Sequence, residues 1–146
     1  MISTPFFSVI ITTYDRAHLI TRALNSLISQ TEKDWEAIIV DDESTDDTFS
    51  RILPFLEGYS KIFYIKQPHK GEPAAKNTGI RSATGRFITF LDSDDEFNPK
   101  HLEFRKTVLL QNPDVKFLYH WLNEYSKKYL LYLSFKITDS GTSSSE

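Results

Sequence analysis

Three carboxylates follow directly after the apolar segment 86–91, and their spacing is the most informative feature of this chain. In an extended chain, residues two apart point to the same side, so the carboxylates of Asp92 and Asp94 can converge on one point. Like charges at that distance repel each other unless a cation or a hydrogen-bond donor lies between them. Oxygen ligands suit Mg²⁺ or Mn²⁺. The pattern predicts a divalent-metal site, and the alternative is an acidic turn in which Asp94 or Asp95 caps the next helix.

A second acidic cluster, Asp41–Asp47, follows another short apolar run, 35–40. In open α/β sheets, ligands bind at the carboxyl ends of the strands, near the point where the strand order reverses. Two acidic strand ends in one small domain therefore predict a single shared site. The local alternative is that Ser44 or Thr45 caps the following helix and that the acids complement its dipole.

Composition and length restrict the classes of protein that remain. The 146 residues suit one domain. The net charge of −3 argues against a general nucleic-acid binder, which needs a basic surface. The absence of cysteine excludes disulfides and thiolate metal sites. No segment approaches the about 20 apolar residues of a membrane span, and the N-terminus has no secretory signal pattern. We therefore expect a cytoplasmic protein.

The elements that must position the two acidic clusters alternate between strands and helices. Helical periodicity predicts the helices, and Asp15 is expected to cap the first of them. Pro54 is expected to interrupt the second helix. This alternation predicts an α/β fold, a mostly parallel sheet with helices on both faces. The predicted strands are 6–12, 35–40, 62–66, 86–91 and 115–119, and the predicted helices are 19–28, 48–56, 74–83 and 100–110.

Two common nucleotide-binding motifs are absent. The first strand-to-helix turn, Thr12–Arg16, contains no glycine, whereas a dinucleotide fold needs G-x-G-x-x-G there to bring backbone close to a pyrophosphate. No G-x-x-x-x-G-K-[ST] motif occurs either. These observations argue against NAD, FAD and P-loop nucleotide chemistry.

Four segments of the chain are informative as an ordered set: Ser8–Arg16 (SVIITTYDR), Ile39–Asp46 (IVDDESTD), Ala75–Ile80 (AKNTGI) and Leu91–Asp95 (LDSDD). Together they resemble the ordered motifs of family-2 glycosyltransferases. The resemblance implies a GT-A fold, a Rossmann-like and mostly parallel sheet, and an inverting enzyme that uses a nucleotide-sugar donor.

The resemblance assigns nucleotide-binding roles around the first two segments. The first nucleotide-contacting loop contains Thr12, Thr13, Tyr14 and Arg16, and the Tyr14 ring can cover a flat base. Asp41 matches the acid that accepts a hydrogen bond from the base, which fits the N–H of uracil and so a UDP-sugar.

Within the second segment, the resemblance makes Asp42, the neighbour of Asp41, a structural residue. Glu43 stands where the family more commonly has glycine, which suggests a different turn.

The last two segments are assigned to the phosphates and the metal. Lys76 stands where the family often has arginine and can meet phosphate, and Asn77 lies in a segment near the ribose. The resemblance implies that Asp94 holds Mn²⁺ or Mg²⁺ and that Asp92 lies against the ribose and the metal. The histidines, His69 among them, share no spacing and are not predicted to be ligands.

The acceptor side is left unassigned. The resemblance implies a saccharide or lipid-linked acceptor, and the expected location is the cytoplasm at large or, by peripheral association, the inner face of the membrane. Only about fifty residues follow Asp94, and no catalytic base is recognisable among them. We expect a core at 1–120, a partial acceptor-side segment at 121–140 and a disordered tail at 141–146. We also expect weak transfer and self-association through the C-terminal segment.

Two alternatives remain. One is a nucleotide-sugar-binding module without catalysis, which shares the predicted site and differs only in turnover. The other is a phosphoacceptor receiver domain, which also has one strand that ends in two acids and a later strand that ends in Asp. The receiver alternative leaves the segment 6–30 unexplained.

Overall fold

The structure, a computed structural model, describes residues 4–114, 117–118 and 134–136. His120, the tail at 141–146 and most of the predicted acceptor-side segment lie outside these residues. The predictions of a disordered tail and of self-association through the C-terminal segment therefore stay predictions. Within the part of the chain that the structure describes, no helix is long and apolar enough to cross a membrane.

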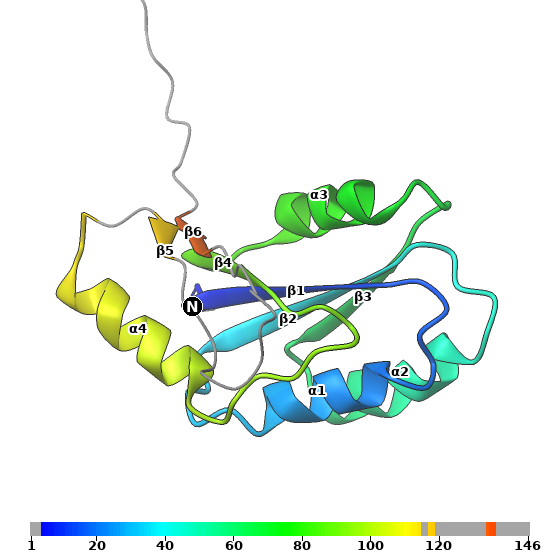
Figure 1. Ribbon diagram of the computed structural model, residues 1–146, viewed down its shortest axis with the longest axis horizontal. Helices are drawn as coiled ribbons and strands as arrows, with labels where there is room; N and C mark the ends of the chain where they lie inside the picture. The colour runs from blue at the N-terminus through cyan, green and yellow to red at the C-terminus, as the bar shows by residue number, and fades with distance from the viewer. Residues whose placement is uncertain (1–3, 115–116, 119–133, 137–146) are drawn as a thin grey trace, which may run out of the picture.

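A six-stranded sheet forms the centre of the molecule, in the order β3-β2-β1-β4-β6-β5 (Figure 1). Strands β1 to β4 pair in parallel, whereas β6 runs antiparallel to both β4 and β5. The predicted α/β class with a mostly parallel sheet is confirmed. The strands are β1 (Phe7–Thr13), β2 (Trp35–Asp41), β3 (Ile62–Lys66), β4 (Phe87–Phe90), β5 (Phe117–Leu118) and β6 (Ser134–Lys136).

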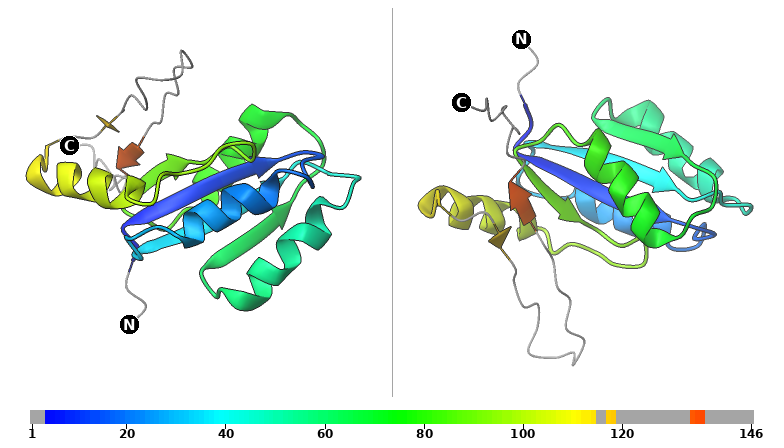
Figure 2. Two further views of the ribbon diagram at one scale, coloured as in Figure 1. Left: turned by 60° about the horizontal axis from the view of Figure 1, so that its bottom comes forward. Right: turned by 90° about the horizontal axis from the view of Figure 1, so that it is seen from above.

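Helices cover both faces of this sheet, α1 and α2 on one face and α3 on the other (Figures 1 and 2). Side chains alternate along each strand, so Val9 and Ala37 pack into the core beneath α1, α2 and α4, whereas Ile38 and Val40 pack with Ala75 of α3. The helices are α1 (Ile20–Ile28), α2 (Thr48–Gly58), α3 (Glu72–Ser82) and α4 (His101–Gln111).

Strand order decides against the receiver domain. A receiver-type sheet has the order β2-β1-β3-β4-β5, in which the first strand neighbours the third. Here β1 lies between β2 and β4, and β3 is at the edge beyond β2. The order β3-β2-β1-β4 is that of the Rossmann-like half-sheet, so the receiver alternative is wrong.

The prediction that Pro54 interrupts the second helix is also wrong, because α2 continues through it to Gly58. A proline inside a helix removes one hydrogen bond to the carbonyl four residues earlier. Both Pro54 and Ser50, whose carbonyl loses its partner, are exposed, so water can satisfy that carbonyl. The helix therefore tolerates the proline.

Gly79 sets the distance between α3 and the sheet. A Cβ atom at this position would lie 2.4 Å from Cγ2 of Ile10, which points from β1 toward α3. Real Cβ atoms do not approach other carbons so closely, so only glycine lets the helix lie at this height. The position of α3 matters because its first turn, with Glu72 and Ala75, reaches the pocket described below.

Replacement of Gly79 by alanine should therefore destabilise the fold by about 1–3 kcal/mol, because the new methyl group overpacks the helix–sheet interface. Gly58→Ala is the matched control, since a Cβ there meets nothing within 4 Å. Urea denaturation followed by circular dichroism measures both variants. Equal unfolding free energies for the two would contradict this role of Gly79.

Candidate functional site

A pocket of about 350 Å³ opens at the carboxyl ends of the parallel strands. It lies at the place where the strand order reverses, since β1 connects through α1 to β2 on one side while its other neighbour is β4. Open α/β sheets bind ligands at such a reversal. The lining residues come from the ends of β1, β2 and β4, the β3–α3 loop and α3: Thr12, Thr13, Tyr14, Arg16, Asp42, His69, Glu72, Ala75, Asp92, Ser93 and Asp94.

The structure brings six of the predicted site residues together in this pocket. They are the last two residues of β1, two residues of the loop that follows it, and the two aspartates after β4: Thr12, Thr13, Tyr14, Arg16, Asp92 and Asp94. The two strand ends are adjacent because β1 and β4 pair in parallel, with Ile10 opposite Phe90. Three predicted residues, Asp41, Lys76 and Asn77, are not among the lining residues.

Lys76 nevertheless contacts the acidic side of the pocket. Its Nζ lies 2.5 Å from Oε1 of Glu72 and 3.4 Å from Oδ1 of Asp92. Burial lowers the pKa of the Lys76 ammonium, but the hydrogen bond that Lys76 donates to Glu72 and the charge of Asp92 outweigh this effect and raise the pKa. Lys76 thus stays charged beside Asp92. Asn77, the next residue on α3, is exposed and does not reach the pocket.

Asp41, which the resemblance assigns to the base, does not line the pocket. Its side chain is buried, with Oδ1 accepting the Ser44 N–H at 2.8 Å and Oδ2 accepting the Tyr64 hydroxyl at 2.6 Å. Burial and this hydrogen bond raise the pKa of Tyr64. Alternation along the strand directs Asp41 toward the α1–α2 face and Asp42 toward the α3 face, where the pocket opens. The structure therefore brings Asp42, rather than Asp41, to the pocket.

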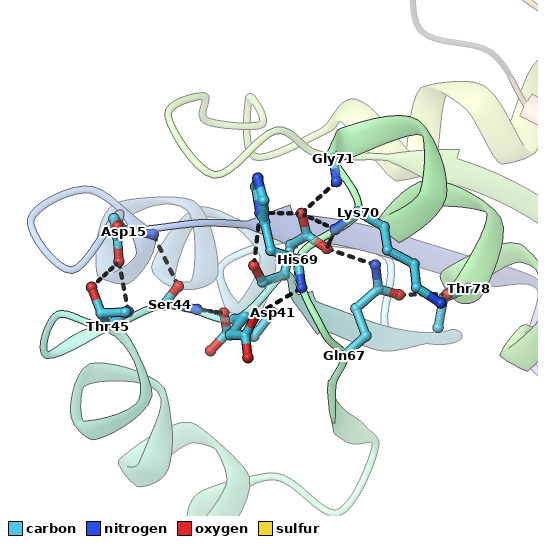
Figure 3. A network of polar contacts seen from close by, with 11 residues as sticks. Asp15, Asp41, Ser44, Thr45, Gln67, His69, Lys70, Gly71 and Thr78 are labelled. Atoms are coloured by element: carbon cyan, nitrogen blue, oxygen red, sulfur yellow. Dashed lines mark hydrogen bonds and ion pairs between the residues drawn. The ribbon is translucent and has the colours of Figure 1, made fainter.

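The Asp42 carboxylate is buried, accepts hydrogen bonds from three donors and forms an ion pair with His69. Figure 3 labels these four partners, Gln67, His69, Lys70 and Gly71. Oδ1 accepts from Gln67 Nε2 at 2.7 Å and from the Lys70 N–H at 3.0 Å. Oδ2 accepts from the Gly71 N–H at 2.8 Å and lies 2.8 Å from His69 Nδ1. Burial alone raises the pKa of Asp42, but these hydrogen bonds and the charge of His69 outweigh it and hold the pKa below its usual value.

His69 is a pocket residue that sequence reasoning missed. Its ring centroid lies 4.4 Å from that of Tyr14, with the planes tilted by 32°. Its backbone N–H donates to Oε2 of Glu43 at 2.9 Å, so the β3–α3 loop is fixed to the β2–α2 loop. No spacing in the sequence indicates this position. The feature of the sequence that could have indicated it is its position in a loop that follows a parallel strand, because such loops lie at the carboxyl edge of the sheet.

The loops after β1 and β2 are joined by reciprocal hydrogen bonds. The Asp15 N–H donates to Oγ of Ser44 at 2.9 Å, and Oδ1 of Asp15 accepts the Thr45 N–H at 2.7 Å (Figure 3). The prediction that Asp15 caps α1 is therefore wrong, because its carboxylate orders the neighbouring loop instead. Helix α1 begins after Leu19 without a side-chain cap. This pair of contacts fixes the segment that presents Tyr14.

Glu43 adopts a φ of 71°, in the left-handed region that favours glycine. Its turn is therefore one that a glycine also makes, and the substitution does not require a different backbone. A residue with a Cβ costs about 1–2 kcal/mol in this conformation. The hydrogen bond from the His69 N–H to the Glu43 carboxylate offsets part of that cost.

The donor set suits a hard divalent cation with a phosphate ligand. Asp92 and Asp94 both line the pocket, and within the described residues no group of three or more His, Cys, Asp or Glu side chains could hold a metal. The protein thus offers two carboxylates, and a bound Mg²⁺ or Mn²⁺ would complete its shell with diphosphate oxygens and water. The loop that carries both acids is held to α1 by Arg22, whose Nη2 donates to the Asp94 carbonyl at 2.9 Å.

Comparison with known proteins indicates the same family as the sequence motifs. The family model of glycosyl transferase family 2 matches residues 8–131. The chain is 36% identical over 112 residues to the UDP-Glc:alpha-D-GlcNAc-diphosphoundecaprenol beta-1,3-glucosyltransferase WfgD of Escherichia coli, an alignment that covers 77% of this chain and 44% of that enzyme.

Two solved structures share the fold. S. aureus TarS 1-349 in complex with UDP-GlcNAc superposes with a TM-score of 0.69 at 30% identity, over 82% of this chain and 36% of that one. The mannosyltransferase PcManGT of Pyrobaculum calidifontis, in complex with GDP-Man and Mn²⁺, also gives a TM-score of 0.69, at 26% identity over 80% of this chain and 35% of that one. The chain thus spans less than half the length of each of these proteins. With the fold, the motifs and the family match in agreement, this chain belongs to glycosyl transferase family 2.

Proposed function

We propose that this chain binds a nucleotide-sugar donor, a UDP-sugar in the first instance, and serves an inverting transfer of the sugar to a saccharide or lipid-linked acceptor. The observation that carries the proposal is the pocket at the strand-order reversal, which joins an aromatic ring, a cation and four carboxylates. The names of similar proteins support the choice of donor, since WfgD is named for UDP-Glc and TarS was solved with UDP-GlcNAc.

In this proposal the donor lies along the carboxyl edge of the sheet. The Tyr14 ring and the Asp42 carboxylate receive the base, and the Arg16 guanidinium and the Lys76 ammonium offset phosphate charge. The Arg16 backbone is fixed because its N–H donates to Oγ1 of Thr48 at 3.1 Å. When bound at Asp92 and Asp94, Mn²⁺ or Mg²⁺ supplies Lewis-acid neutralisation of the diphosphate leaving group.

The acceptor side of the proposal is coarser. WfgD is named for an undecaprenol-linked acceptor, so we propose a lipid-linked acceptor and a cytoplasmic location at the inner face of the membrane. Inverting transfer needs a general base to take the proton of the acceptor hydroxyl, and we assign that role to none of the described carboxylates. The second candidate, a binding module without catalysis, predicts donor binding with no transfer across a panel of sugar and lipid-linked acceptors.

The metal assignment predicts that UDP binds more tightly with Mn²⁺ than in EDTA, and that Asp94→Asn removes most of this gain. Loss of a charged ligand typically costs about 1–3 kcal/mol, which is roughly fivefold to 150-fold in affinity. Titration calorimetry with UDP measures the effect. Asp114→Asn is the control, because it makes the same chemical change at an exposed position outside the pocket. Equal UDP affinity in EDTA and Mn²⁺ would sink the assignment.

The base assignment predicts that the protein prefers UDP to CDP by about tenfold or more. Uracil presents an N3–H to a carboxylate, whereas cytosine presents an acceptor there, and an unpaired buried acceptor costs about 1–3 kcal/mol. Thymine carries the same N3–H, so TDP should compete almost as well as UDP. Competition binding at fixed Mn²⁺ with the three nucleotides tests this. If CDP competes as strongly as UDP, Asp42 does not select the base.

A further inference from the structure

His69 makes the two contacts that the proposed function assigns to a nucleobase. Its planar ring lies against the Tyr14 ring, 4.4 Å away between centroids. Its Nδ1 forms an ion pair with Oδ2 of Asp42 at 2.8 Å and lies 3.2 Å from the backbone carbonyl oxygen of the same residue. A uracil base would stack on the same tyrosine and donate its N3–H to the same carboxylate. The imidazole and the base therefore compete for one place.

The Asp42 carboxylate has no room for an additional donor. A carboxylate offers about four lone-pair sites, and three hydrogen-bond donors together with the ion-pair contact from His69 Nδ1 already surround the two oxygens. Two of those donors are the backbone N–H groups of Lys70 and Gly71, and Gln67 is held in turn because its Oε1 accepts the Thr78 hydroxyl at 2.6 Å (Figure 3). A base can bond to Asp42 only if one donor leaves.

His69 is the donor that can leave at the lowest cost. Its side chain is 51% exposed, whereas that of Asp42 is 3% exposed. The backbone of His69 is fixed separately, by the hydrogen bond from its N–H to Glu43. Rotation about its χ1 therefore releases the ring without unfolding the loop, and the other three donors to Asp42 stay in place.

Resting on the proposed function, we propose that His69 is a built-in competitor of the nucleobase. Its ring occupies the base position in the structure and swings out when the nucleotide binds. This exchange lowers the apparent affinity for every nucleotide, because the binding-competent arrangement is only fractionally populated. It also keeps Asp42 paired and Tyr14 covered before the donor arrives.

The sign of one mutational effect separates this proposal from the ordinary alternative, in which His69 is a fixed wall on which the base packs. Removal of a competitor strengthens binding, whereas removal of a wall weakens it. His69→Ala should bind UDP about three- to thirtyfold more tightly than the wild type, the range expected when one aromatic pair and one half-exposed ion pair no longer have to be broken. His69→Phe, which keeps a ring but not the donor, should give a smaller gain.

The experiment is calorimetric titration of UDP with Mg²⁺ into wild-type protein and both His69 variants, with His18→Ala as the control. His18 is an exposed histidine outside the pocket, so its replacement should leave the UDP affinity unchanged. Weaker or equal UDP binding by a folded His69→Ala overturns the inference while the proposed function stands. Absence of UDP binding by all four proteins overturns both.

A second measurement uses the wild-type protein and does not depend on any variant's stability. The imidazole signals of His69, identified by their absence from the His69→Phe spectrum, should carry the ring-current shift from Tyr14 in the free protein. Addition of UDP and diamagnetic Mg²⁺ should remove that shift as the ring leaves. A ring-current shift that persists at saturating UDP shows that His69 stays in place and overturns the proposal.

Discussion

The buried carboxylate of Asp42 is the group on which the site depends. A charge removed from water is costly unless hydrogen bonds replace its hydration, and here the β3–α3 loop supplies that replacement. Two backbone N–H groups and two side chains converge on the two oxygens. The end of β2 and the segment 67–71 are therefore ordered together. This pairing positions His69 against Tyr14 and sets the start of α3, which in turn carries Glu72 and Lys76 to the acidic side of the pocket.

A second set of hydrogen bonds orders the loop at the end of the neighbouring strand, β1, in a similar way. Asp15 exchanges hydrogen bonds with Ser44 and Thr45, so the loops after β1 and β2 hold each other. Both loops contain a residue with positive φ, Asp15 at 50° and Glu43 at 71°, and in both cases a carboxylate of that residue is bonded to another loop. Backbone strain is thus located beside the pocket, where contacts between loops compensate for it.

The sequence predicts what local physics determines. The observed strand β3 has the predicted bounds, 62–66, and the rule that parallel strands end at one edge predicts a shared site for the two acidic clusters, from which Asp42 and Asp92 line one pocket. The choice between Asp41 and Asp42 could not be made in this way. Alternation shows that the two point to opposite faces, but which face bears the pocket depends on where α3 packs, and that depends on Gly79 and Ile10.

His69 shows the limit of such reasoning most clearly. Its role follows from a loop conformation that exists only because Asp42 needs donors, which is a tertiary requirement invisible to spacing or periodicity. The same requirement explains why Asp42 combines a structural role with a place in the pocket. Its three hydrogen-bond donors hold the loop and stabilise the fold, whereas its fourth contact comes from the His69 side chain, which can move. A carboxylate that is saturated by the protein itself can accept a ligand only by exchange, so selectivity for a base rests on which donor replaces the imidazole.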